Sequence, residues 1–144
     1  MIKLEKELTS KQILNLINLD LSGQGGKENE IAEALGHERI HQPLVDARCP
    51  ITGLFYEYKK QSRDQWFDLH KLSGLSSTQK SMSVLFFVHE GGKFKDLYQT
   101  TYQGVIDSIN LNEEDWEWAR KAPVGAQVKY SLTFNQIKEF VCLT

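Results

Sequence analysis

The sequence predicts an α/β fold, an α+β arrangement in which a mixed sheet is flanked by helices. Three observations favour this class. Apolar residues recur at helical spacing over residues 13–21, which is typical of an amphipathic helix. Residues 54–61 are rich in β-forming side chains and follow a turn that contains Pro50 and Gly53. Residues 84–89, Val-Leu-Phe-Phe-Val-His, are an almost continuous apolar run, as in a central strand covered on both faces.

Two helices are predicted before the first strand. The first covers residues 1–21, with Thr9 or Ser10 as its cap and an apolar stripe that packs on the core or on a second copy. Residues 22–27 are rich in glycine and form a loop. The second helix covers residues 27–35 and ends at Gly36, because glycine readily adopts the backbone conformation that terminates a helix.

A hairpin is predicted next. Its strands cover residues 40–47 and 54–61, and its turn covers residues 49–53. A helix over residues 63–72 follows, because apolar side chains recur there at helical spacing. The segment 73–83 is rich in hydroxyl, amide and lysine groups, which contact phosphates in DNA complexes, and is a candidate DNA-facing segment.

The remaining elements are predicted from apolar runs, turn residues and charge placement. Gly91 and Gly92 form the turn of a second hairpin. Acids at the start and bases at the end of segment 113–121 favour a helix, since they complement the helix dipole. The strands of this part cover residues 84–89, 94–101 and 128–134, and its helices cover residues 102–109, 113–121 and 135–143.

Length and composition indicate one domain over residues 1–144. Hydrophobic residues make up 40% of the chain and charged residues 25%, which is ordinary for a globular protein. No apolar run approaches the roughly 20 residues that span a bilayer, and the N-terminus lacks the apolar core of a signal peptide. We therefore expect a cytoplasmic protein with no membrane partner.

Two carboxylates and an amine are predicted to meet on the first hairpin. Alternate residues of a strand share one face, so Glu57, Lys59 and Gln61 lie on the same side of the strand over residues 54–61. Asp46, near the end of the preceding strand, then lies beside Glu57. Two carboxylates from separate strands suit Mg²⁺, which keeps several waters and leaves positions for a phosphate. Lys59 can orient a water and offset charge on that phosphate.

At these residues the chain resembles the PD-(D/E)xK nuclease superfamily, which includes many type II restriction endonucleases and Holliday junction resolvases. Asp46 matches the family's metal-bridging aspartate, and Glu57 and Lys59 match its acidic residue and lysine. The chain departs from the motif in that Pro43 stands three residues before Asp46 instead of next to it. The resemblance covers about residues 25–90, where the order of helix, two strands, helix and strand is also that of the family core.

The resemblance implies a restriction-endonuclease-like core and a Mg²⁺-dependent DNA endonuclease in which Mn²⁺ can replace Mg²⁺. It also implies that a glutamate on the helix before the sheet joins the metal site, with Glu28 as the match and Glu30 as the other choice. Gln61 is a further candidate catalytic residue. A type II restriction endonuclease is favoured for a chain of one domain, and cutting both strands of a duplex would require a homodimer. A junction resolvase or a repair nuclease is the nearest alternative.

Two other classes of function stay open. Residues 37–41 read His-Glu-Arg-Ile-His, the spacing with which a helix presents two histidines to zinc in metallopeptidases. Gly36 and Pro43 flank this segment, which favours a loop leading into a strand. A non-catalytic binding module is the third possibility. The net charge of −2 is unusual for a DNA-binding protein, although Lys59, Lys60 and Arg63 are expected to gather at the proposed site.

Overall fold

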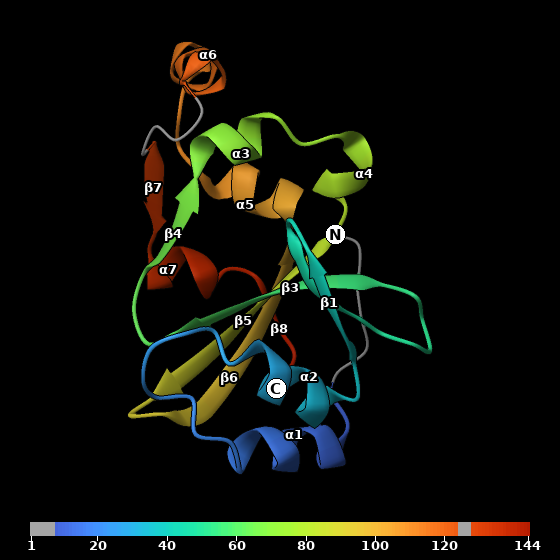
Figure 1. The fold of residues 1–144 in the computed structure, drawn as a ribbon. Helices are drawn as coiled ribbons and strands as arrows, with labels where there is room; N and C mark the ends of the chain where they lie inside the picture. The colour runs from blue at the N-terminus through green and yellow to red at the C-terminus, as the bar shows by residue number, and fades with distance from the viewer. Residues whose placement is uncertain (1–7, 124–127) are drawn as a thin grey trace.

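The computed structural model describes residues 8–123 and 128–144, and a mixed sheet flanked by helices lies at its centre (Figure 1). In the six-stranded sheet, β3 and β5 pair in parallel and the other neighbours pair antiparallel. The predicted fold class is therefore confirmed at this level. The strands, in spatial order, are β1 (Glu38–Gln42), β2 (Val45–Arg48), β3 (Phe55–Gln61), β5 (Ser83–Glu90), β6 (Lys93–Thr101) and β8 (Val141–Cys142).

Helices α1 (Ser10–Ile17) and α2 (Glu28–Leu35) cover one face of this sheet (Figure 1). Thr9 caps α1 in a capping box with Gln12, which satisfies backbone N–H groups of the first turn. The core on this side consists mainly of aliphatic residues from both helices packed on alternate residues of β3 and β5. Its members include Leu16, Leu21, Ile31, Leu35, Tyr56, Tyr58, Leu85 and Phe87.

The opposite face of the sheet is covered by helices and by a second, two-stranded sheet (Figure 1). That small sheet pairs β4 (Gln65–Asp68) with β7 (Lys129–Leu132). The helices of this half are α3 (Leu69–Ser73), α4 (Ser77–Lys80), α5 (Tyr102–Ser108), α6 (Glu113–Lys121) and α7 (Phe134–Ile137). The second core includes Phe67, Leu72, Val84, Phe86, Tyr102, Val105, Leu132 and Ile137. Because side chains alternate along β3, Tyr56 and Tyr58 enter the first core and Glu57 faces the second half.

Most elements after residue 83 were correctly predicted. The predicted strands 84–89 and 94–101 correspond to β5 and β6, and the predicted helix 113–121 has the bounds of α6. The predicted strand 128–134 is shorter, as β7. No described helix is long and apolar enough to cross a membrane.

Three predicted elements were wrong in kind or extent. Residues 40–47 form a hairpin of β1 and β2 instead of one strand, because the chain turns at Pro43 and Leu44, where Leu44 has a φ of 72°. Segment 63–72 contains β4 before α3, so its start is extended. Segment 135–143 contains α7 and then β8, which pairs with β6.

Two further predicted segments differ in their bounds. The predicted helix 1–21 ends at Ile17, and its part before residue 8 lies outside the described residues. The buried Leu21 lies beyond the end of the helix, where its N–H donates to the carbonyl of Gly92. The polar segment 73–83 contains the short helix α4, capped by Ser76.

Candidate active site

The candidate site begins where β2 separates from β3. Their ladder pairs Ala47 with Tyr56 and Arg48 with Phe55. One step further along, the backbone N–H of Tyr58 donates to Oδ2 of Asp46 at 2.8 Å. The carboxylate of Asp46 thus takes the place that a backbone carbonyl of β2 would occupy. This hydrogen bond fixes the side chain of Asp46 between the two strands.

Asp46 and Glu57 form a close pair of carboxyl groups. Each side chain is only 16% exposed, so the pair is partly buried but open to solvent. The pKa of Glu57 is raised to about 7, chiefly by burial and also by the negative charge of Asp46 and a hydrogen bond with its carboxyl group, while the charge of Lys59 opposes the rise. A bound cation would relieve this repulsion, so the pair suits a metal ion that accepts hard oxygen ligands.

Lys59 completes the trio that the sequence predicts. Its Nζ lies 3.7 Å from Oε1 of Glu57. The same Nζ lies 5.1 Å from the centroid of the Phe67 ring on β4, within the range of a cation–π contact. Asp46, Glu57 and Lys59 are therefore brought together, with the amine held between the carboxylate pair and the second half of the molecule.

Tyr102 and Arg39 also contact the carboxylates, and sequence reasoning missed both. The Tyr102 hydroxyl lies 2.6 Å from the carbonyl of Leu44, to which it donates, and 3.3 Å from Oε2 of Glu57. Burial and the charge of Glu57 raise the pKa of Tyr102, so the hydroxyl stays a neutral donor. Arg39 donates to the backbone carbonyl of Asp46 at 2.6 Å, and its guanidinium lies 3.9 Å from Oδ1 of that residue. Tyr102 is too distant in sequence for strand spacing to reveal it.

Glu28 and Gln61 do not join the trio. Among residues 8–123 and 128–144, no group of three or more histidine, cysteine, aspartate or glutamate side chains is arranged to hold a metal ion. The Glu28 carboxylate instead lies over Gly26, and Glu30 is exposed. Gln61 is 5% exposed, and neither polar atom of its amide has a hydrogen-bond partner. Four residues of strand separate it from Glu57 by about 13 Å.

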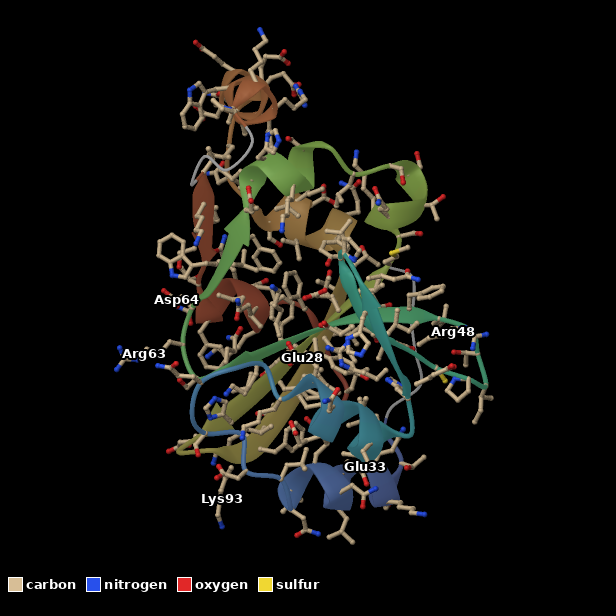
Figure 2. The ribbon with its side chains drawn as sticks, in the orientation of Figure 1. Glu28, Glu33, Arg48, Arg63, Asp64 and Lys93 are labelled. Carbon is tan, nitrogen blue, oxygen red and sulfur yellow. The ribbon has the colours of Figure 1, made fainter. Side chains whose placement is uncertain are left out.

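The prediction that Lys59, Lys60 and Arg63 gather at the site is wrong in part. Lys60 points to the opposite face of β3 from Lys59, where its Nζ donates to the carbonyl of Gly23 at 2.8 Å. Arg63 projects outward from the loop after β3 (Figure 2). Lys59 is therefore the only one of the three beside the carboxylate pair.

The two histidines of the His-Glu-Arg-Ile-His segment do not form a zinc pair. Glu38 to Gln42 is strand β1, and in an extended chain positions 37 and 41 are about 13 Å apart. His37 shares a 2.6 Å hydrogen bond with the Tyr58 hydroxyl and stacks on Tyr56. Burial lowers the pKa of His37 to about 4, so the ring is neutral at pH 7. His37 is therefore half-buried against Tyr56 and Tyr58.

A cavity of about 400 Å³ opens beside the trio, and Lys59 and Tyr102 form part of its wall. A larger cavity, of about 740 Å³, lies between α4, α5 and β6, and its lining includes none of Asp46, Glu57 and Lys59.

The chain matches no protein-family model, and no curated protein matches its sequence. The carboxylate pair and its lysine are therefore the features that point to a function.

The raised pKa of Glu57 predicts a loss of stability with increasing pH. The native state holds a proton on Glu57 up to about pH 7, whereas the unfolded chain releases it near pH 4.5. The free energy of unfolding should therefore fall by about 1–3 kcal/mol as the pH rises through this window. Urea denaturation at pH 5 and pH 8 should show this fall in the metal-free protein, and Mg²⁺ should reverse it at pH 8.

Glu57→Gln is the matched variant for this measurement, because its amide does not titrate. We expect the difference in unfolding free energy between pH 5 and pH 8 to be smaller in Glu57→Gln than in the wild type. The same pH dependence in both proteins would contradict a raised pKa at Glu57.

Proposed function

We propose that the protein is a Mg²⁺-dependent DNA endonuclease that hydrolyses phosphodiester bonds. The observation that carries the proposal is the convergence of Asp46, Glu57 and Lys59 from β2 and β3 at a partly exposed point. Two hard oxygen ligands and an adjacent amine are the set that metal-assisted phosphodiester hydrolysis needs.

The fold supports a restriction-endonuclease-like core. The order of elements is α2, the strands β1 to β3, the crossover through β4, α3 and α4, and then β5 in parallel with β3. The sequence resemblance to the PD-(D/E)xK superfamily implies a helix, strands carrying the Asp and Glu-x-Lys residues, a helix and a further strand. Asp46 and Glu57, the pair that we assign to the metal, lie on the neighbouring strands β2 and β3, which supports this comparison.

Each residue of the site has a role in this proposal. Asp46 and Glu57 would hold Mg²⁺ through their carboxylate oxygens, which are ligands that this ion prefers. When bound, the ion would supply Lewis-acid polarisation of the phosphoryl oxygen and a lowered pKa of a water. Lys59 orients the attacking water and offsets the negative charge that develops on the phosphate. The water oxygen bonds to phosphorus and its displaced proton passes to solvent, while the bond to the leaving sugar oxygen breaks and that oxygen takes a proton from solvent.

Tyr102 and Arg39 are positioning residues in this scheme. The Tyr102 hydroxyl lies against Glu57 and donates to the Leu44 carbonyl, so it links the carboxylate to the β1–β2 turn. Arg39 holds the backbone of Asp46. Both contacts restrict the carboxylates to one geometry before the ion binds, and such preorganisation lowers the cost of binding.

One candidate is a type II restriction endonuclease that acts as a homodimer, because each chain offers one site and duplex cleavage needs two cuts. A Holliday junction resolvase or repair nuclease would use the same chemistry on a different DNA structure. In both cases the partners are DNA and a second copy of the chain.

The test is a cleavage assay with purified protein, plasmid DNA, a synthetic four-way junction and either Mg²⁺, Mn²⁺ or EDTA. We expect cleavage with both ions and none with EDTA. The substrate that is cut separates the restriction and resolvase alternatives. If both DNA forms stay intact while the protein still binds DNA, the binding-module alternative replaces the nuclease.

A further inference from the structure

A cavity with a basic lining, here called the β4 cavity, lies beside the carboxylate pair. It has a volume of about 400 Å³, and its lining includes Lys59 from β3, Trp66 and Asp68 from β4, Lys71 from α3 and Lys129 from β7. Three lysines therefore face one acid. The single acid, Asp68, is already used as the cap of α3, where its carboxylate accepts hydrogen bonds from the backbone N–H groups of His70 and Lys71.

Lys71 and Lys129 are available to a ligand. In the part of the chain that the structure describes, neither has an acidic partner within ion-pair distance. Both side chains are exposed, and they come from different elements, α3 and β7. Two cations held on separate rigid elements beside one cavity suit two charges of an extended anion better than one small ion.

Trp66 adds an exposed aromatic surface to the same wall. Its side chain is 57% exposed, whereas the next residue, Phe67, is buried under Lys59. This alternation along β4 turns the indole ring outward. An exposed tryptophan flanked by lysines is the combination with which proteins bind single-stranded nucleic acid, because bases stack on the ring and lysines bind phosphates.

The β4 cavity borders the candidate active site. Lys59 and Tyr102 both line the cavity and both contact Glu57, at 3.7 Å and 3.3 Å. A chain bound along Lys129, Lys71 and Trp66 would therefore arrive at Lys59 and then at the carboxylate pair.

We propose that the β4 cavity binds a single-stranded segment of DNA next to the scissile phosphate, with phosphates on Lys71 and Lys129 and a base stacked on Trp66. This inference rests on the proposed nuclease function, and it specifies the substrate as DNA with a single-stranded or locally opened stretch, which favours the resolvase or repair nuclease over a restriction endonuclease that cuts intact duplex. A base in an intact duplex does not expose its face to an indole ring, so stacking on Trp66 requires an unpaired base.

The test measures binding without catalysis. A fluorescein-labelled single-stranded oligonucleotide and the matching duplex are titrated with the full chain in EDTA, and affinity is followed by anisotropy at several salt concentrations. We expect tighter binding of the single strand. Trp66→Ala should weaken that binding about 10-fold, and Lys71→Ala combined with Lys129→Ala should reduce the slope of log affinity against log salt by about 1.

Matched controls use groups of the same kind elsewhere on the surface. Trp118 is an exposed tryptophan on α6, and Lys93 is an exposed lysine at the start of β6, at the far end of the sheet (Figure 2). Trp118→Ala and Lys93→Ala should bind the single strand like the wild type. Trp66→Phe should retain most of the affinity, because the phenyl ring still offers a stacking surface.

The outcomes separate this inference from the proposed function. If Mg²⁺-dependent cleavage occurs but Trp66→Ala binds and cuts DNA like the wild type, the β4 cavity is not the binding site and the nuclease proposal stands. If no DNA is cut but single-strand binding depends on Trp66 and the lysines, the cavity assignment stands and the nuclease proposal fails. Equal loss of affinity in Trp118→Ala, or a preference for RNA or for duplex DNA, would overturn the cavity assignment.

Discussion

Lys59→Ala should fold normally and lose about 10²–10⁴-fold of the Mg²⁺-dependent cleavage rate. The Nζ of Lys59 lies 3.7 Å from Glu57 and beside the β4 cavity, so it is the described amine that can reach both a metal-bound phosphate and its attacking water. Removal of the amine leaves the carboxylate pair in place. We therefore expect Mg²⁺ to bind, and initial cleavage rates at saturating Mg²⁺ should report the loss.

Lys60→Ala is the matched control for this variant. Lys60 is the next residue of β3, has the same charge and lies on the opposite face, where it donates to Gly23. Its removal should leave cleavage within about 3-fold of the wild type, because it is far from the developing charge on the phosphate. Equal activity of Lys59→Ala and the wild type would refute the assigned site, and equal losses in both variants would point to nonspecific weakening of DNA binding.

Phe86→Ala should reduce the free energy of unfolding by about 3–5 kcal/mol, since it removes a large buried ring and leaves a cavity. Phe86 lies on β5 in the centre of the sheet and is fully buried. Its ring centroid is 6.2 Å from that of Phe67 and 5.6 Å from that of Phe140. Phe67 in turn supports Lys59, so the loss should also loosen the wall of the β4 cavity.

Urea denaturation followed by tryptophan fluorescence measures this loss. Ile51→Ala is the control, because Ile51 is 92% exposed at the tip of the β2–β3 hairpin and an exposed site should change stability by less than about 0.5 kcal/mol. A change below about 1 kcal/mol for Phe86→Ala would mean that the second core does not depend on this ring.

The sequence predicted the parts of the site that depend on local spacing. Strand alternation places Glu57 and Lys59 on one face, and the turn between β2 and β3 returns the chain so that Asp46 reaches Glu57. The same two-residue alternation also places Gln61 on the face of Glu57 and Lys59. Alternation alone could not show that the end of β3 is covered, so that the Gln61 amide is buried instead of exposed at the site.

The missed features depend on contacts between distant segments. Tyr102 reaches Glu57 across a separation of 45 residues, and nothing in its own neighbourhood marks it as more than the start of a helix. The segment of β4 is predicted as part of a helix from the sequence, because Trp66 and Phe67 both fit the apolar positions of a helical pattern. Its pairing with β7 turns only Phe67 inward, so tertiary pairing overrode the local pattern.

The hydrogen bond between Tyr58 and Asp46 determines which substitution of Asp46 is suitable for making an inactive variant that binds DNA without cutting it. Asp46 anchors the hairpin in addition to its proposed role as a metal ligand, since its side chain accepts a hydrogen bond from Tyr58 and its carbonyl accepts one from Arg39. Truncation to alanine would leave the Tyr58 N–H without its acceptor, whereas Asp46→Asn keeps an oxygen there and removes the negative charge. The amide is therefore the better substitution for crystallising a stalled assembly.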